Sequence, residues 1–110
     1  MYVYKLNPGN SLTLRVRNGT PNALVVPCYS VRGTGPTDVG IGVFLDLTQP
    51  IVDMTPFRLG SGGYGEVVAG RVPPWAPLDL PVYFQGVEIT FQSGQSIRLT
   101  NSITKPITAN

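Results

Sequence analysis

The sequence has no histidine and a single cysteine, Cys28. Without imidazole there is no Ser-His or Cys-His nucleophile pair, no histidine general base and no histidine metal ligand. A lone cysteine forms no intrachain disulfide and no cysteine zinc site. Cys28 lies in the apolar run from Ala23 to Tyr29, where we expect a small buried side chain rather than a reactive thiol.

Charge is also scarce, because only 13% of the 110 residues are Asp, Glu, Lys or Arg, with a net charge of +2. So small a net charge does not favour nucleic acid or a membrane surface as partner. The six carboxylates are too widely spaced for a calcium loop, and a glycosidase pair would depend on the fold to bring two of them together. We expect no catalytic site, cofactor or metal, and a surface that partners cover in part.

Long apolar runs are absent as well. No stretch approaches the roughly 20 residues that span a bilayer. The opening residues, Met1 to Lys5, show no basic segment followed by an apolar one, so no secretory signal is expected.

Apolar residues do recur with a period of two, which predicts β-strands. In Ser11–Arg17, Leu12, Leu14 and Val16 share one face. The other expected strands are Tyr2–Leu6, Leu24–Val31, Ile41–Leu47, Ile51–Leu59, Gly65–Ala69, Leu80–Phe91 and Ser96–Ile103. Leu24–Val31 is almost continuously apolar, which indicates burial on both faces. Gly- and Pro-rich turns lie between the strands, including the loop Gly60–Gly63.

Two features lie in the C-terminal half of the pattern. Val82 and Phe84 are even-numbered whereas Val87, Ile89 and Phe91 are odd-numbered, so we expect a β-bulge at Gly86. Residues Gln92–Gln95 then predict a hairpin turn onto the strand that follows.

The segment from Val72 to Pro81 is rich in proline and contains Trp75, the single tryptophan. Proline at this density favours extended, polyproline-like backbone. We expect a stiff crossover between two sheets with Trp75 folded onto the core. The alternative is a rigid ligand for an aromatic groove on a neighbouring molecule.

The two ends of the chain are the expected assembly arms, residues 1–6 and 104–110. Tyr2 and Tyr4 share one face of an edge strand, which either closes the sheet or offers a surface to a sugar or a neighbouring subunit. The last residues contain Pro106 and few large apolar groups, so we expect them to fray in isolation and to anchor on a neighbour through Ile107. Tyr2, Tyr4, Trp75 and Ile107 are the predicted assembly contacts.

Three segments together resemble a known module. They are Gly9–Val16, Leu80–Gly86 and Ile97–Ile103, with the proline-rich crossover between the first two. In this order they are similar to the C-terminal module of large secreted planctomycete-type surface proteins. The resemblance implies a β-sandwich without a known catalytic site, and it transfers no functional residue.

These observations predict one all-β domain over residues 1–110: a single antiparallel β-sandwich or jelly-roll-like barrel of about seven or eight short strands. The expected function is non-catalytic and structural, first as a phage virion surface protein such as a capsid decoration protein or another head or tail component. The alternatives are a secreted or cell-surface adhesion or filament module, and a carbohydrate-binding module. Expected partners are further copies of the chain or a capsid or filament lattice protein, and the expected location is the virion or else the cell exterior.

Overall fold

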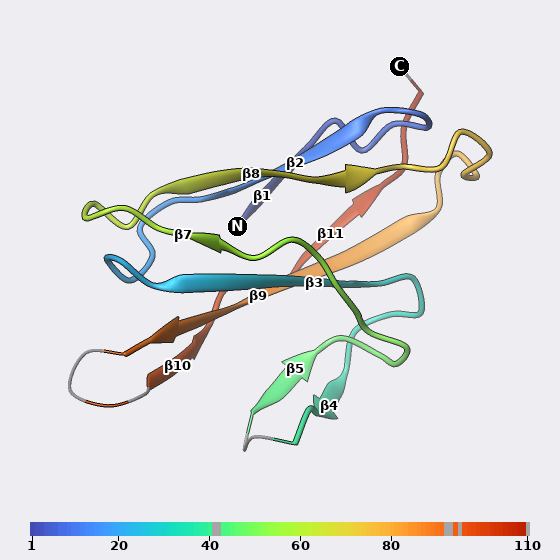
Figure 1. Cartoon of the computed structure of the whole chain (residues 1–110). Helices are drawn as coiled ribbons and strands as arrows, with labels where there is room; N and C mark the ends of the chain where they lie inside the picture. Colours follow the sequence, from blue (N-terminus) through green and yellow to red (C-terminus); the bar gives the residue numbers. More distant parts are fainter. Residues whose placement is uncertain (41–42, 92–93, 95, 110) are drawn as a thin grey trace.

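The structure is a computed structural model that describes residues 1–40, 43–91, 94 and 96–109. These residues form strands and turns with no helix (Figure 1), which confirms the all-β class. The strands are β1 (Tyr2–Tyr4), β2 (Ser11–Val16), β3 (Leu24–Ser30), β4 (Pro36–Asp38), β5 (Phe44–Asp46), β6 (Val52–Asp53), β7 (Phe57–Arg58), β8 (Gly65–Arg71), β9 (Pro81–Thr90), β10 (Ser96–Leu99) and β11 (Ile103–Pro106).

The strands pair antiparallel in two large sheets and one small hairpin. The first sheet has the order β1-β2-β8, and the second has the order β10-β9-β3-β6, with β11 also on β9 and β7 also on β3. Strands β4 and β5 pair only with each other among the described residues. The two large sheets face each other (Figure 1), so the molecule contains the expected antiparallel β-sandwich.

The main core fills the space between the two large sheets. Leu12, Leu14 and Val16 all point inward from β2, as their spacing predicts. They belong to one buried cluster with Val25 of β3 and Phe84 of β9. Tyr29 adds a ring contact to Phe84, with 6.4 Å between the ring centroids.

The second sheet is covered on its other face too. Leu45 and Leu47, on and just after β5, form a second buried cluster with Cys28 of β3 and Val87 of β9. The molecule therefore has three layers, and β3 with β9 lies in the middle one (Figure 1). This explains why Leu24–Val31 reads as apolar on both faces.

The predicted bulge at Gly86 is wrong. The pairing of β9 with β3 continues without a shift through Pro27 and Gly86. The change of parity has another cause: Val82 and Phe84 face the main core, whereas Val87 and Ile89 face the second cluster on the opposite side.

The irregularities lie on neighbouring strands instead. Thr100 to Ser102 pass opposite Gln85 and Gly86, so the extra residue belongs to the chain between β10 and β11. A register shift also separates Leu12 from Thr13 where β2 pairs with β8.

Several predicted strands are shorter or divided in the structure. The Ile51–Leu59 segment gives the two short strands β6 and β7, and both pair with β3. The C-terminal arm of the predicted hairpin pairs with β9 as expected, but as two strands, β10 and β11. Ile41 and Gly42, and the turn residues Gln92, Ser93 and Gln95, lie outside the described residues.

The described residues of both expected assembly arms are part of the folded domain, so the expectation that the C-terminal arm frays is corrected. Ile107 is only 4% exposed and joins the main core with Met1, Val3 and Leu6. Its N–H donates to the Leu80 carbonyl at 3.0 Å and its carbonyl accepts from the Asp79 N–H at 2.8 Å. Residues 103–106 also pair with β9, at the edge of the sheet, where Pro106 is tolerated. The apolar side chains at both ends therefore close the core of their own molecule.

Candidate functional site

The proline-rich segment runs from β8 of the first sheet to β9 of the second, which confirms the predicted crossover. Two hydrogen bonds fix its start, from Val72 N–H to the Asn10 carbonyl at 2.8 Å and from Gly9 N–H to the Val72 carbonyl at 2.9 Å. Trp75, however, is 80% exposed. The expectation that its ring lies as a lid on the core is wrong, because a turn from Pro73 to Ala76 carries it outward.

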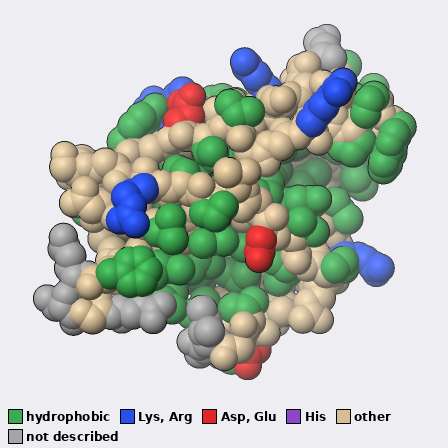
Figure 2. Space-filling view, viewed as in Figure 1, with side chains coloured by type: hydrophobic (Ala, Val, Ile, Leu, Met, Phe, Trp, Pro, Cys, Tyr) green, Lys and Arg blue, Asp and Glu red, His purple; other side chains and the backbone are tan. Residues whose placement is uncertain are grey.

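A pocket of about 420 Å³ opens beneath this crossover, at the end of the sandwich. Tyr29 and Phe84 line it from the second sheet, Ile107 lines it from the C-terminal segment, and Trp75 stands at its rim. Arg71 is its one charged lining residue among those described. Figure 2 shows hydrophobic side chains gathered at the upper right, where the crossover lies. The result is a projecting indole beside an apolar recess.

The outer face of the first sheet is different in character. Tyr2, Tyr4, Arg15, Arg17 and Glu66 project from it, and we call these five residues the tyrosine face. The Arg15 guanidinium lies 4.8 Å from the centroid of the Tyr4 ring, and that of Arg17 lies 5.9 Å from the Tyr2 ring. Cations at these distances are attracted to the ring faces.

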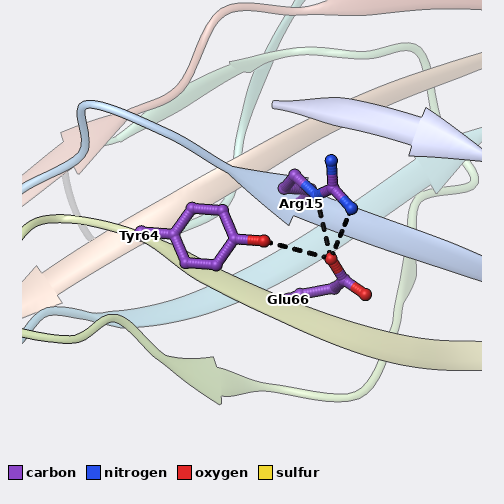
Figure 3. Close-up of polar contacts among 3 residues, drawn as sticks. All are labelled: Arg15, Tyr64 and Glu66. Atoms are coloured by element: carbon purple, nitrogen blue, oxygen red, sulfur yellow. Dashed lines mark hydrogen bonds and ion pairs between the residues drawn. The ribbon is translucent and has the colours of Figure 1, made fainter.

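Strand β8 supplies the acidic member of this face (Figure 3). The Arg15 guanidinium donates to one carboxylate oxygen of Glu66 at 2.8 Å, and the Tyr64 hydroxyl donates to the same oxygen at 3.2 Å. The bond from Arg15 lowers the pKa of Glu66, and the same bond raises the pKa of Arg15. Because both side chains are solvated, this ion pair fixes the orientation of Arg15 and Glu66 more than it stabilises the fold.

A third surface feature lies on the far side of the second sheet. It is an open groove of about 940 Å³ between that sheet and the β4–β5 hairpin, lined by Val26, Cys28, Asp38, Val39, Gly40, Leu45, Gln49, Pro50, Ile51, Asp53, Val87 and Ile89. We call it the Asp53 groove. Figure 2 shows hydrophobic side chains gathered in the lower half of the view, around β5.

Cys28 lies on the floor of this groove. Its thiol donates to Asp53 Oδ1 at 3.4 Å. Burial, together with this bond and the nearby carboxylate charge, raises the pKa of the thiol to about 12. Such a thiol is protonated at neutral pH and so is a poor nucleophile. Cys28 is buried, as the sequence predicts.

The predicted contacts do not form one site. Trp75 and Ile107 line the same pocket, but only Trp75 is accessible. Tyr2 and Tyr4 lie on the tyrosine face, 49% and 37% exposed. The sequence did not predict the Asp53 groove, because its walls come from segments far apart in the chain. The apolar pattern on both faces of β3 was the one sequence feature that pointed to a covered surface there.

Comparisons with protein-family models, with curated proteins and with solved structures each found no match. Across the described ranges there is no helix long and apolar enough to cross a membrane. Within those same ranges, no three His, Cys, Asp or Glu side chains are grouped as metal ligands.

Proposed function

We propose that the protein is a non-catalytic structural protein that assembles with copies of itself on the surface of a particle, a phage virion in the first instance. The observation that carries this proposal is Trp75, whose side chain is 80% exposed beside an apolar pocket. Tryptophan is enriched at the energetic centres of protein interfaces, and burying its ring removes a large apolar area from water. A solvated tryptophan at this place favours a docking role.

A second copy of the chain is the occupant that this end of the molecule fits best. Trp75 and the exposed Leu78 project from the crossover, and the recess lies directly beside them. One surface thus holds both a projection and a hollow, which is what a two-fold contact between identical subunits needs. The apolar lining with a single cation suits an indole ring from the partner.

The contact is small, and this bears on the kind of assembly. An aromatic side chain buries roughly 150–250 Å², whereas stable interfaces bury about 1,200–2,000 Å² in total. We therefore expect weak pairing in solution that strengthens where many copies are held together on a lattice. The low fraction of charged residues favours the same role.

The single tryptophan makes the test direct, since its fluorescence reports on this contact alone. Concentrating the protein in about 0.5 M NaCl, where charge contacts are screened, should shift the emission to shorter wavelength and protect it from acrylamide. Sedimentation velocity should show a dimer that Trp75→Ser weakens at least tenfold.

Phe91→Ser is the matched control, because Phe91 is an aromatic residue, 61% exposed, that follows the end of β9 far from the crossover. It should leave dimerisation unchanged. A wild-type protein that stays monomeric with fully quenchable fluorescence at millimolar concentration contradicts the proposal. Mass spectrometry of purified virions tests the location separately.

A further inference from the structure

The tyrosine face and the Asp53 groove lie on opposite sides of the molecule. The first is the outer surface of β1, β2 and β8, and the second lies beyond β3 and β9, on the other side of the main core. Figure 1 shows this order of layers, with β2 and β8 at the top and the β4–β5 hairpin at the bottom. Any attraction between the two surfaces therefore acts between molecules and not within one.

The charges of the two surfaces are opposite in sign. Lys105 and Lys5 reinforce Arg15 and Arg17 at the tyrosine face: the Lys105 Nζ lies 5.8 Å from the Tyr4 ring centroid, and the charge of Lys5 contributes to lowering the pKa of Glu66. Glu66 is the carboxylate of that face. In the groove the only charged groups among the described lining residues are Asp38 and Asp53.

The shapes and apolar content also match. The β4–β5 hairpin covers only part of the outer surface of the second sheet, so Val26 and Ile89 remain half-buried in the groove wall. A volume of about 940 Å³ is at the upper limit for small-molecule pockets, and the groove is open. It suits a row of side chains from a strand, such as Tyr2 and Tyr4, better than one compact ligand.

We infer that the tyrosine face of one copy docks into the Asp53 groove of the next copy, with Arg17 meeting Asp53. Arg17 is suited to this role because it forms no ion pair with another residue in the described part of the chain, whereas Arg15 is held by Glu66. A contact between two different surfaces of identical subunits is head-to-tail, so it builds a ring or an open filament. This inference rests on the proposed self-assembly, but it uses a contact separate from Trp75.

The test is charge reversal in a Trp75→Ser background, which removes the other contact. In about 20 mM NaCl this protein should form oligomers larger than dimers by sedimentation velocity, and about 0.5 M NaCl should dissociate them. Arg17→Glu or Asp53→Lys alone should weaken association at least tenfold. The double variant should associate within about threefold of the parent, as should an equimolar mixture of the two single variants.

Two further variants serve as controls for this test. Arg32→Glu makes the same change at an exposed cation that belongs to neither surface and should leave association unchanged. Asp53→Asn keeps an oxygen acceptor for the Cys28 thiol, so it separates loss of charge from loss of folding. It should weaken association less than Asp53→Lys, with an unchanged denaturant midpoint.

Monomers in low salt, or charge variants that behave like Arg32→Glu, overturn the head-to-tail contact. If the wild type still dimerises through Trp75 in that case, the proposed function stands. If neither contact forms, both proposals fail.

Discussion

Lys105 closes one side of the sandwich by donating from Nζ to the carbonyl oxygen of Val3 at 2.6 Å. The two residues belong to β11 and β1, the edge strands of opposite sheets. Unpaired carbonyls along an edge strand invite another strand to add, and a lysine placed there is a common protection. Addition of a neighbouring strand at β1 is opposed by this bond.

Lys105→Met keeps the aliphatic length but removes the donor, so the Val3 carbonyl loses its partner. We expect the free energy of unfolding to fall by about 1–2 kcal/mol, measured by urea denaturation. Lys5→Met removes an exposed charge that makes no such bond to the described residues, and it should change the free energy of unfolding by less than about 0.5 kcal/mol. Equal effects would show that Lys105 acts only through charge.

Ile107 provides a second prediction, because it lies in the core and not on an arm. Ile107→Ala should reduce the free energy of unfolding by about 2–5 kcal/mol, the usual cost of a large-to-small change in a core. Deleting residues 104–110 should prevent stable folding altogether. The exposed Val68→Ala is the control, and a truncated protein with an unchanged melting temperature contradicts this account.

The sequence was informative where the local pattern and the burial agree. The alternation of Leu12, Leu14 and Val16 predicted the inward face of β2, and the apolar run around Cys28 predicted a strand buried on both sides. The sequence was misleading at Ile107. The C-terminal tail is mostly polar, and only the fold brings its one large apolar side chain into the core with Leu6 and Leu80.

At Gly86 the sequence pointed to a structurally special position but predicted the wrong cause for it. The sequence suggested a bulge, but a Cβ on Gly86 would lie 3.2 Å from both Thr100 Cγ2 and Val25 Cγ1. The glycine is needed for close packing against neighbouring segments of the same sheet, which no periodicity in one strand reveals.

Gly86→Ala should therefore cost about 1–3 kcal/mol of stability through overpacking. Adding Thr100→Ser removes the Cγ2 methyl and keeps the hydroxyl that accepts from the Gly86 N–H at 2.8 Å. The double variant should regain part of the loss relative to Thr100→Ser alone. An equal cost in both backgrounds, from paired urea titrations, would contradict the packing explanation.

The Cys28 thiol gives a prediction in pH. Its pKa is about 12 in the folded protein against 9.0 as the ordinary value. The folded state therefore holds the proton more tightly, so the contribution of Cys28 to stability is complete below pH 9.0 and is lost as pH rises toward about 12.

The comparison with Cys28→Ala isolates this effect, because the two proteins differ only in this side chain. The difference in urea midpoint between them should shrink as the pH is raised from about 8 to about 11. Ellman's reagent should react with the native thiol at neutral pH only at the rate of unfolding. A constant difference and rapid labelling would show that the thiol is solvated.

The position of β3 in the middle layer has a kinetic consequence. Leu24 pairs with Ile89 and Ser30 pairs with Tyr83. Strand β3, which is apolar on both faces, therefore pairs over its whole length with β9, a strand far along the chain. Pairings of this separation form slowly, since a long loop must close first. During synthesis β3 therefore remains without its partner until β9 has left the ribosome. Its exposed apolar run is where misfolding would begin, and yield at high temperature should respond to substitutions in β3 more than to equally destabilising ones in β2.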